Sequence, residues 1–513
     1  MTPRNPHSEL RWIPVLLLAA ILSDGASATT YVLQPDGTGD FPTIQDAISA
    51  CQDGDVVALM DGTYTGSGNR DIDFLGRAIT VGSREGNLQP CVIDCEATAI
   101  DRHRAFLFLS GEGPESVLRG LTILHGNAIH EDWPTGLGGG VLCNQSSPTL
   151  IDCSFRADSS NYGGAFGCTG ISVPTLQGCT FENNWSRWYG GAIQCGDGAS
   201  PVITSCTFTG NQSGGVCGGA GGAICCNWTC TPTISFCTFT GGWAQYFGGA
   251  ICSSGGQAML DHCTLVGNRA DSDGGAVFSW QGGRVVLDRC TLVGNAAPRG
   301  GGAATWDGST LDFRNTIIAF GIQGIAVACG PEDAVLTCCD VYGNAGGDWV
   351  GNITGQYGVE GNISEDPLFC GEASPEAPYT LHSDSPCAPG ANPECGRIGA
   401  WMVGCGAFAD VAGDPGERSR FSLSPAVPNP FVTETRVDLG LAIAPGSASL
   451  LVGVYDPTGR LIRTLAARAQ GAEDQRVTWD GRNSAGARVP PGVYFMGLIR
   501  EGSRRVTAVT LLR

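Results

Sequence analysis

Residues 190–195 are Gly-Gly-Ala-Ile-Gln-Cys, and residues 203–208 are Ile-Thr-Ser-Cys-Thr-Phe. Both phrases return along the chain, and successive copies of the second lie 24 to 32 residues apart. Copies of the first phrase begin at Gly138, Gly163, Gly221, Gly248, Gly274 and Gly300. Copies of the second contain Cys153, Cys179, Cys237, Cys263 or Cys290, and degenerate copies lie at Leu121, Asn315 and Cys339.

Each phrase is about five residues of alternating character between glycine or asparagine, a pattern typical of a short strand between turns. No helical spacing of apolar residues occurs between residues 130 and 350. A period near 26 residues with two or three short strands fits one coil of a parallel β-helix, whose coils bury their inward side chains only by stacking on one another. The sequence therefore predicts an all-β solenoid.

Stacked coils lie about 4.8 Å apart, so a repeated position becomes a column of like residues. One predicted column belongs to the core and contains Val141, Phe166, Ile193, Ile224, Ile251 and Val277. A second column mixes cysteine with serine and contains Cys143, Cys168, Cys195, Cys226, Ser253 and Ser279. Two interpretations of the cysteines stay open: buried thiols pack as small apolar groups, whereas column neighbours are close enough for disulfide bonds.

Asparagine follows the repeated cysteine by five residues. The copies are Asn184, Asn211, Asn268, Asn295 and Asn344. Because asparagine tolerates the left-handed backbone conformation, we expect these residues to form turns. Asn184 and Asn211 also match the N-x-S/T signal for glycosylation, which is the alternative interpretation.

Both ends of a solenoid expose core and need a cap. We expect an N-terminal cap at residues 29–55, because Ile44, Ala47, Ile48 and Cys51 would share one face of a short helix with Thr43 as its N-cap. Coils are expected at about residues 56–365.

Residues 366–410 are rich in proline and cysteine and are predicted to form an irregular closing segment. Its cysteines, Cys370, Cys387, Cys395 and Cys405, are the best disulfide candidates. The adjacent pairs Cys225-Cys226 and Cys338-Cys339 suit neither zinc nor an ordinary bridge.

Residues 1–28 are predicted to be a signal peptide. Arg4 and Arg11 precede an apolar stretch from Trp12 to Leu22, and Ala26-Ser27-Ala28 matches a cleavage site. An N-terminal membrane anchor is the alternative, but this stretch is shorter than the about 20 residues that span a bilayer. We therefore expect an exported protein that begins at Thr29 and has no membrane span.

The composition excludes several classes. Glycine supplies 78 of 513 residues without a collagen period, and the charged fraction is only 15%. The net charge is −20, and all 29 basic residues are arginine, so we expect no nucleic-acid partner. Residues 411–513 carry a net charge of +4 and residues 1–410 one of −24, which indicates two differently built parts.

The C-terminal part has no cysteine. After a linker at residues 411–423, segments of alternating character are separated by turns such as Asp456-Pro457-Thr458-Gly459 and Asp480-Gly481. Strands are expected at 435–439, 449–455, 461–465, 476–479 and 493–498. Residues 424–513 are therefore predicted to be a small immunoglobulin-like β-sandwich.

Residues 30–125, with YVLQPDGTGDFPTIQDAI and DGDVVALMDGTYTG, resemble the opening of pectin-lyase-like proteins. This resemblance implies a right-handed parallel β-helix over about residues 30–408. The GGA[IVF] and CTF/CTL…GN phrases are similar to the repeats of polymorphic outer-membrane proteins, although only Phe181-Glu182-Asn183-Asn184 keeps the Phe-x-x-Asn form literally.

The phrases NPF, VYDPTGRLIRTL, WDGRNSAGARVPPGVYF and VTAVTLLR resemble two related domains. One is the immunoglobulin-like domain of flagellar hook-capping (FlgD-like) proteins, an assembly domain. The other is the C-terminal sorting domain of type IX secretion cargo, a signal for crossing the outer membrane. The resemblance therefore implies secretion machinery or the cell surface as a partner, and an extracellular or outer-membrane location.

Acidic residues follow the strand that precedes the repeated cysteine. Asp261 and Asp288 share a register, whereas Asp152 and Asp312 are expected one residue out of it. Carboxylates one coil apart can bind Ca²⁺ or act as an acid and base on glycosides. A solvated strand edge is the alternative. No other cofactor or metal is expected.

Trp280 and Trp306 each lie six residues after a Gly-Gly start, and stacked indoles would form a platform for a sugar. Packing of surface turns is the alternative. The histidines show no metal spacing, and neither the downstream catalytic motifs of pectin methylesterases nor a lyase-like Arg/Asp set is found.

Three functions remain. The favoured one is a non-enzymatic, exported, adhesin-like or display protein whose C-terminal module directs secretion or attachment at the outer membrane. The second is a polysaccharide lyase or glycoside hydrolase acting in a groove, and the third is a glycan-binding module using Trp280 and Trp306. Carboxylates converging in a cleft beside aromatic residues would favour the enzyme.

Overall fold

The computed structural model describes residues 28–405 except 85–89, 130–132, 216–217 and 372–377. Beyond residue 420 it describes 421–423, 431, 433–441, 450–455, 461–467, 475–483, 486, 488–489, 492–500 and 503–511. Residues 1–27 of the predicted signal peptide and 411–420 of the predicted linker lie outside the described residues. The chain divides into two units, Met1–Pro367 with Pro386–Trp401, and Leu368–Ser385 with Met402–Arg513.

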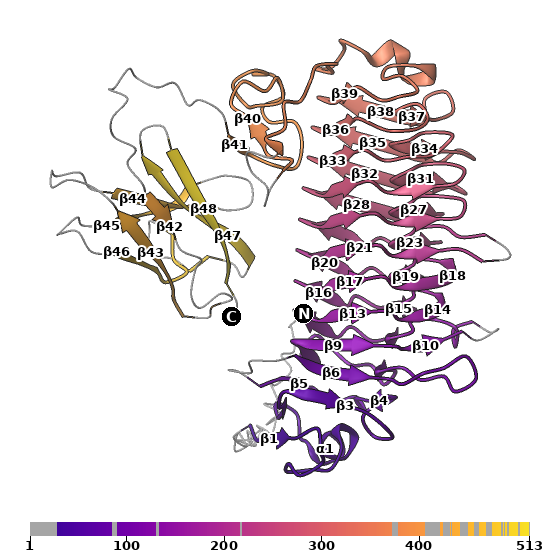
Figure 1. Cartoon of the computed structure of the whole chain (residues 1–513), viewed down its shortest axis with the longest axis vertical. Coiled ribbons are helices and arrows are strands. Elements are labelled where there is room, and N and C mark those ends of the chain that lie inside the picture. Colours follow the sequence, from indigo (N-terminus) through magenta and orange to yellow (C-terminus); the bar gives the residue numbers. More distant parts are fainter. Residues whose placement is uncertain are drawn as a thin grey trace, which may run out of the picture. The chain divides into compact units, whose positions relative to one another are not determined.

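The first unit is the predicted solenoid, built from four parallel sheets that we name A to D (Figure 1). Sheet A contains β1 (Thr30–Leu33), β2 (Val56–Leu59), β5 (Thr80–Ser83), β8 (Val117–Arg119), β12 (Thr149–Ile151), β16 (Thr175–Gln177), β20 (Val202–Thr204), β24 (Thr233–Ser235), β28 (Gln257–Asp261), β32 (Arg284–Asp288), β35 (Thr310–Arg314) and β38 (Ala334–Thr337). Sheet B contains β3 (Gly62–Tyr64), β6 (Cys91–Asp94), β9 (Leu121–Leu124), β13 (Ser154–Arg156), β17 (Thr180–Glu182), β21 (Thr207–Thr209), β25 (Thr238–Thr240), β29 (Thr264–Val266), β33 (Thr291–Val293), β36 (Ile317–Ala319) and β39 (Asp340–Tyr342).

Sheets C and D complete each coil. Sheet C contains β4 (Ile72–Asp73), β7 (Phe106–Phe108), β11 (Val141–Asn144), β15 (Phe166–Thr169), β19 (Ile193–Cys195), β23 (Ile224–Asn227), β27 (Ile251–Ser254), β31 (Val277–Trp280), β34 (Ala303–Thr305) and β37 (Val327–Ala328). Sheet D contains β10 (Asn127–Ala128), β14 (Ser159–Tyr162), β18 (Trp185–Tyr189), β22 (Gln212–Ser213), β26 (Trp243–Ala244) and β30 (Arg269–Ala270). The Gly-Gly phrase supplies sheet C, and the Cys-Thr-Phe phrase supplies the end of sheet A and all of sheet B.

The predicted columns are confirmed. Ile193 pairs in register with Ile224, which pairs with Ile251, and all three side chains are fully buried. In sheet B, Phe208 stacks between two other phenylalanines with ring centroids 4.8 and 4.6 Å away. The inward side chains of sheets A, B and C thus form one continuous apolar core.

The cysteine columns are buried thiols. Among the described residues, 19 cysteines are unbridged, and every one is buried. Burial raises the pKa of the Cys339 thiol to about 12, because the charged thiolate would lose its hydration. Disulfides between neighbours in a column do not form in this structure.

Two disulfides lie at the end of the solenoid and beyond it. Cys370 bonds to Cys405, and both were predicted disulfide candidates. Cys395, another candidate, bonds to Cys338, which was not one. The expectation that the Cys338-Cys339 pair forms no bridge was therefore wrong for Cys338. Adjacent residues point to opposite sides, so Cys339 is in the core and Cys338 is on the outer surface. Cys387, a further candidate, is an unbridged buried thiol.

The expected role of the repeated asparagines was wrong. The left-handed residue at the corner between sheets B and D is the residue before the asparagine, for example Asn183 with φ 54° and Gly210 with φ 62°. The asparagines themselves are buried, and Asn184 and Asn211 are 0% and 1% exposed. Asn184 Nδ2 donates to the Phe155 carbonyl at 3.1 Å and to Asn211 Oδ1 at 3.0 Å, which leaves it no access to a glycosylating enzyme.

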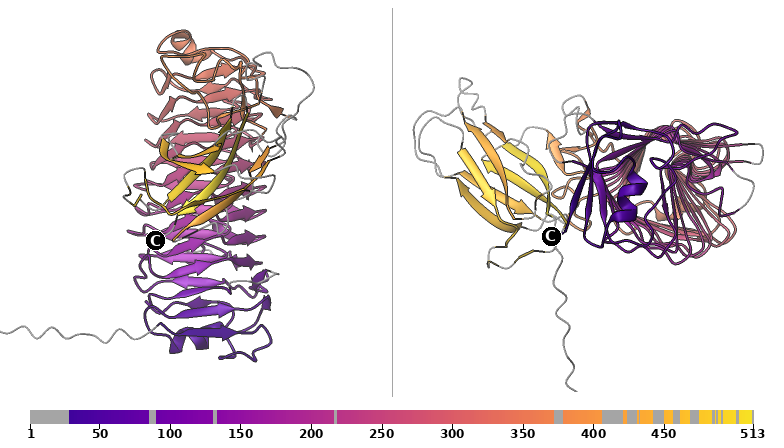
Figure 2. Two further views of the ribbon diagram at one scale, coloured as in Figure 1. Left: turned by 90° about the vertical axis from the view of Figure 1, so that its left-hand side faces the viewer. Right: turned by 90° about the horizontal axis from the view of Figure 1, so that it is seen from below.

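Both ends of the solenoid are capped. Helix α1 (Ile44–Ala50) lies across the N-terminal end, and Thr43 Oγ1 accepts a hydrogen bond from the Asp46 backbone N–H, as the sequence predicts (Figure 2). At the other end, the 3₁₀ helix η1 (Gly351–Gln356) buries Ile353 against the last coils.

The second unit contains a β-sandwich. One sheet is formed by β42 (Phe421–Leu423), β43 (Thr435–Leu441) and β46 (Gln475–Trp479), and the other by β45 (Leu461–Ala467), β44 (Leu450–Tyr455), β47 (Gly492–Arg500) and β48 (Ser503–Leu511). Trp479 is fully buried in its core. Strand β42 lies at the end of the segment predicted to be a linker. A small pair, β40 (Leu381–His382) and β41 (Val403–Cys405), belongs to the same unit.

Candidate functional site

A column of aromatic residues runs along the corner between sheets D and C. It is formed by the residue that immediately precedes each Gly-Gly phrase. Tyr162 pairs with Tyr189, and Ala220 pairs with Tyr189 on one side and with Phe247 on the other. The next two members of the column are Asp273 and Arg299. The corner glycines, such as Gly190 with φ 62°, turn the chain sharply enough to leave these side chains on the outer surface.

The column covers a second, smaller apolar cluster on the outward face of sheet C. This cluster contains Ala220, Cys225, Cys252, Phe278, Ala304 and Ala328. Tyr189, Phe247 and Trp280 pack against it from outside. This second cluster explains why two cysteines are adjacent in the sequence. Cys225 faces the outer cluster, whereas Cys226 faces the inner core.

The column is interrupted at Ala220, and the interruption forms a groove of about 280 Å³. Tyr189 and Phe247 lie two coils apart, about 9.6 Å, and the small side chain of Ala220 does not fill this interval. Gly218, with φ 104°, passes so close to Tyr246 that a Cβ atom there would meet its ring at 2.2 Å.

The walls of the groove are aromatic. They comprise Tyr162, Trp188, Tyr189, Tyr246, Phe247 and Trp280. The rings contact one another in tilted geometry, with centroids 5.0 Å apart for Tyr162 and Trp188 and 5.7 Å apart for Phe247 and Trp280. Burial raises the pKa of Tyr189 to about 12, so its phenol is neutral and available as a donor.

Two hydrogen-bond donors at the groove have no partner. The indole N–H groups of Trp188 and Trp280 are buried and unpaired among the described residues. Buried polar groups without partners are uncommon and point to a ligand or water that completes them. The groove therefore offers aromatic faces, and two of its wall residues carry buried, unpaired N–H groups.

Of the two tryptophans predicted for a sugar platform, only Trp280 lines the groove. Trp306 lies beyond it, where its Nε1 donates to Asp273 Oδ1 at 3.0 Å and the Arg299 guanidinium sits over its ring at 5.5 Å. The predicted stacking of Trp280 on Trp306 is not found among the ring contacts of the described residues. Tyr162, Tyr189 and Phe247 were missed, although their position directly before Gly-Gly was a visible signal.

The acidic candidates lie elsewhere, on the outward side of sheet A. Asp261 and Asp288 pair in register, as predicted. Asp312 is two positions out of that register, not one, because Asp288 pairs with Arg314. Asp152, in contrast, forms the corner after β12 with φ 51°, and burial raises the pKa of its carboxyl.

Arginines lie beside three of the four predicted carboxylates, Asp261, Asp288 and Asp312. Asp312 contacts Arg314 at 2.6 Å and Arg284 at 3.1 Å, and Arg289 lies 3.5 Å from Asp288 and 4.0 Å from Asp261. No carboxylate lines the aromatic groove. The convergence of acids and aromatic residues that would favour an enzyme is therefore not present in the described part of the chain.

In the described ranges, no group of three or more His, Cys, Asp and Glu side chains is arranged to hold a metal ion. Among the same residues, no helix has both the length and the apolar character needed to cross a membrane.

Comparison with known protein families places both units. Residues 116–243 and 216–364 match the right-handed β-helix region family, and residues 425–497 match the FlgD Ig-like domain family. The chain is a right-handed β-helix protein with a C-terminal FlgD Ig-like domain. No curated protein sequence matches it.

Similar solved structures match this chain at low identity and low TM-score. A pectin methylesterase from carrot is 12% identical with a TM-score of 0.32, covering 72% of this chain and 93% of its own. A tailspike protein of the E. coli bacteriophage HK620 is 9% identical with a TM-score of 0.20, covering 94% and 84%. Dimeric latent PorU from Porphyromonas gingivalis is 19% identical with a TM-score of 0.17; the match covers 20% of this chain and 10% of PorU. The matched part of the β-helix protein thus spans about a tenth of the length of PorU. None of these similarities indicates an activity for this protein.

Proposed function

We propose that this β-helix protein is an exported, adhesin-like protein that binds a glycan in its aromatic groove without cleaving it. The observation that carries the proposal is a groove walled by six aromatic side chains and lined by no carboxylate. In the same proposal, the C-terminal FlgD Ig-like domain directs secretion or attaches the protein at the outer membrane.

The groove has the chemistry that sugars require. Aromatic faces pack against the C–H faces of a pyranose ring. Ligand sites generally combine a largely apolar wall with a few placed polar groups, and a volume of about 280 Å³ is near the lower end of such sites. This size fits part of a chain rather than a whole oligosaccharide.

One observation favours the competing function, glycoside hydrolysis. Asp261 and Asp288 are one coil apart, about 4.8 Å, which is near the about 5–5.5 Å between the carboxyl groups of retaining glycosidases. Against it, neither carboxylate lines the aromatic groove, and Arg289 lies 3.5 Å from Asp288 and 4.0 Å from Asp261.

The binding test is affinity electrophoresis of the mature chain in gels that contain a mannan, a xylan, a β-glucan or polygalacturonate. We expect retardation by at least one glycan and loss of that retardation in the Tyr246→Ala/Trp280→Ala variant. Truncation of two stacking rings removes about 1.5–3 kcal/mol each of apolar contact, so Kd rises at least tenfold. Tyr357→Ala is the matched control, since Tyr357 is 56% exposed and packs on Trp349 in the C-terminal cap.

The same glycans are then assayed for release of reducing ends. Retention without release supports the proposal. Release that disappears in Asp261→Asn/Asp288→Asn would establish the hydrolase instead, and neither retention nor release on any glycan would remove both functions.

The role of the FlgD Ig-like domain is tested separately, by expressing the chain with and without residues 424–513 in its host and fractionating the cells. We expect the truncated chain to be retained inside the cell. Equal release of both forms would contradict a sorting or attachment role.

A further inference from the structure

The segment Pro386–Trp401, which we call the strap, runs back along the β-helix after the last coil. Trp401 Nε1 donates to Thr264 Oγ1 at 2.7 Å, and the Ala400 backbone N–H donates to Thr291 Oγ1 at 2.9 Å. The Gly399 N–H donates to the Asn315 carbonyl at 2.6 Å. The strap therefore contacts successive coils on the outward face of sheet B.

The strap buries a face that is open elsewhere in the same sheet. Thr264, Thr291, Ile317 and Asp340 occupy one outward column of sheet B and are 2%, 0%, 0% and 0% exposed. Thr207, in the same column three coils before Thr291, is exposed. The earlier coils of sheet B form their strands without such a cover, as β21 with its exposed Thr207 does. The strands of sheet B therefore do not need the strap in order to form.

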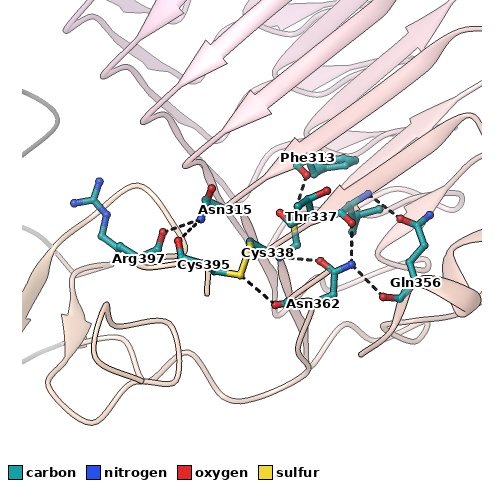
Figure 3. Close-up of a disulfide and its surroundings, with 11 residues drawn as sticks. Phe313, Asn315, Thr337, Cys338, Gln356, Asn362, Cys395 and Arg397 are labelled. Atoms are coloured by element: carbon teal, nitrogen blue, oxygen red, sulfur yellow. Dashed lines mark hydrogen bonds between the residues drawn. A yellow bond between two sulfur atoms is a disulfide. The ribbon is translucent and has the colours of Figure 1, made fainter. Parts of the chain in front are cut away.

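A covalent bond fixes the strap near its middle. Cys395 is bonded to Cys338, and Asn315 Nδ2 donates to the carbonyls of Cys395 at 2.9 Å and Arg397 at 3.3 Å (Figure 3). Both cysteines of this bridge are partly exposed, whereas all 19 described free thiols are buried. A reductant in solution can therefore reach this bond without opening the core.

Asp340, beneath the strap, contributes little to holding it. Cys387 Sγ, fully buried, donates to Asp340 Oδ2 at 3.2 Å, and thiols are weak donors. The carboxylates of Glu365 and Asp348 are the charged groups that act on Asp340, and both repel its negative charge. The strap thus covers a buried acid for which the described neighbours supply no cation.

We propose that the strap is a redox-controlled latch, closed by the Cys338–Cys395 bond and released when a dithiol reduces it. The dithiol gives two electrons and two protons to the bond. Two cysteine thiols form, and the dithiol becomes a disulfide. Because the chain enters the C-terminal unit on both sides of the strap, release removes one of the places where the chain of this unit is fixed to the β-helix.

Cys387 is a built-in reporter of the latch, because its thiol is buried only while the strap is closed. The mature full-length protein is exposed to maleimide at pH 7 with and without prior reduction by dithiothreitol, and labelled peptides are identified by mass spectrometry. We expect Cys387 to be protected in the oxidised protein. Reduction should raise its labelling rate on the order of 30-fold or more, while Cys263 and Cys290 in the core stay protected.

Two variants separate the latch from general loosening. Cys395→Ser should label at Cys387 without reductant. Cys405→Ser removes the other disulfide, within the second unit, and should leave Cys387 protected. Continued protection of Cys387 after reduction of Cys338–Cys395 would overturn the proposal, and so would simultaneous labelling of the core cysteines. If Cys395→Ser does not fold, the comparison of oxidised and reduced wild-type protein decides.

Discussion

At the scale of single residues, the corner between sheets B and D depends on a buried side-chain amide. Asn211 Nδ2 donates to the Phe181 carbonyl, and Asn268 Nδ2 to the Phe239 carbonyl, at 2.8 and 3.0 Å. Each amide oxygen accepts from the backbone of the preceding coil, as Asn295 Oδ1 does from Asn268 N–H. Asparagine suits this position because one side chain donates and accepts at once.

Asp158 occupies the same ladder position and cannot do both when ionised. Its Oδ1 accepts from Gly126 N–H at 2.7 Å, but Oδ2 is buried without a partner, and burial raises the pKa of this carboxyl well above its usual value. We expect Asp158→Asn to stabilise the protein at pH 7 by about 1–3 kcal/mol, measured by urea unfolding. The gain should shrink toward pH 4, where the protonated acid donates as the amide would. Asn211→Asp is the reciprocal variant and should lose stability as the pH rises.

A second buried acid gives a defined pH range. Burial raises the pKa of Asp340 to about 7, while an unfolded aspartate titrates near 3.9. Because the folded pKa is the higher one, the stability of the wild type should fall as pH rises from about 4 to about 7 and then level off. Relative to Asp340→Asn, the loss is at most about 4 kcal/mol. Parallel pH–stability curves for the two proteins would contradict the assignment.

At the scale of elements, the Gly-Gly corners decide where the outer surface is filled and where it is hollow. The residue before each corner is aromatic at Tyr162, Tyr189 and Phe247, and the groove exists because Ala220 interrupts this column. We expect Ala220→Tyr to continue the column and to abolish retardation by glycans, with at least a tenfold rise in Kd. The thermal unfolding midpoint should change little, since aromatic residues already occupy the two flanking positions. Unaltered retardation would show that the ligand binds elsewhere.

At the scale of the whole β-helix, the stacked cysteines test the continuity of the core. All described free cysteines are buried, and an exported chain would meet an oxidising medium. We expect iodoacetamide at pH 8 to leave Cys153, Cys179 and Cys206 unmodified in the native protein and to alkylate them after unfolding in guanidinium without reductant. Failure to alkylate them after such unfolding would reveal disulfides between coils.

Much of the fold followed from periodicity, because a core column repeats the same residue type at each coil. Ile193, Ile224 and Ile251 could be aligned from sequence alone, and so could helix α1 with its Thr43 cap. The candidate site was harder to predict. Trp280 was found through its spacing, but Asp261 and Asp288 were equally regular and lie on another sheet.

The sequence alone determined the solenoid, its N-terminal cap and the β-sandwich, since these depend on local alternation, turn residues and a repeat that places like side chains in line. Only the tertiary structure decided which outward residues share a surface, that the strap returns over sheet B, and that Cys338 bonds to Cys395. Those features join positions that are far apart in the chain or on different coils. Their geometry depends on the direction in which the chain turns at each corner. The sequence repeat does not encode that direction.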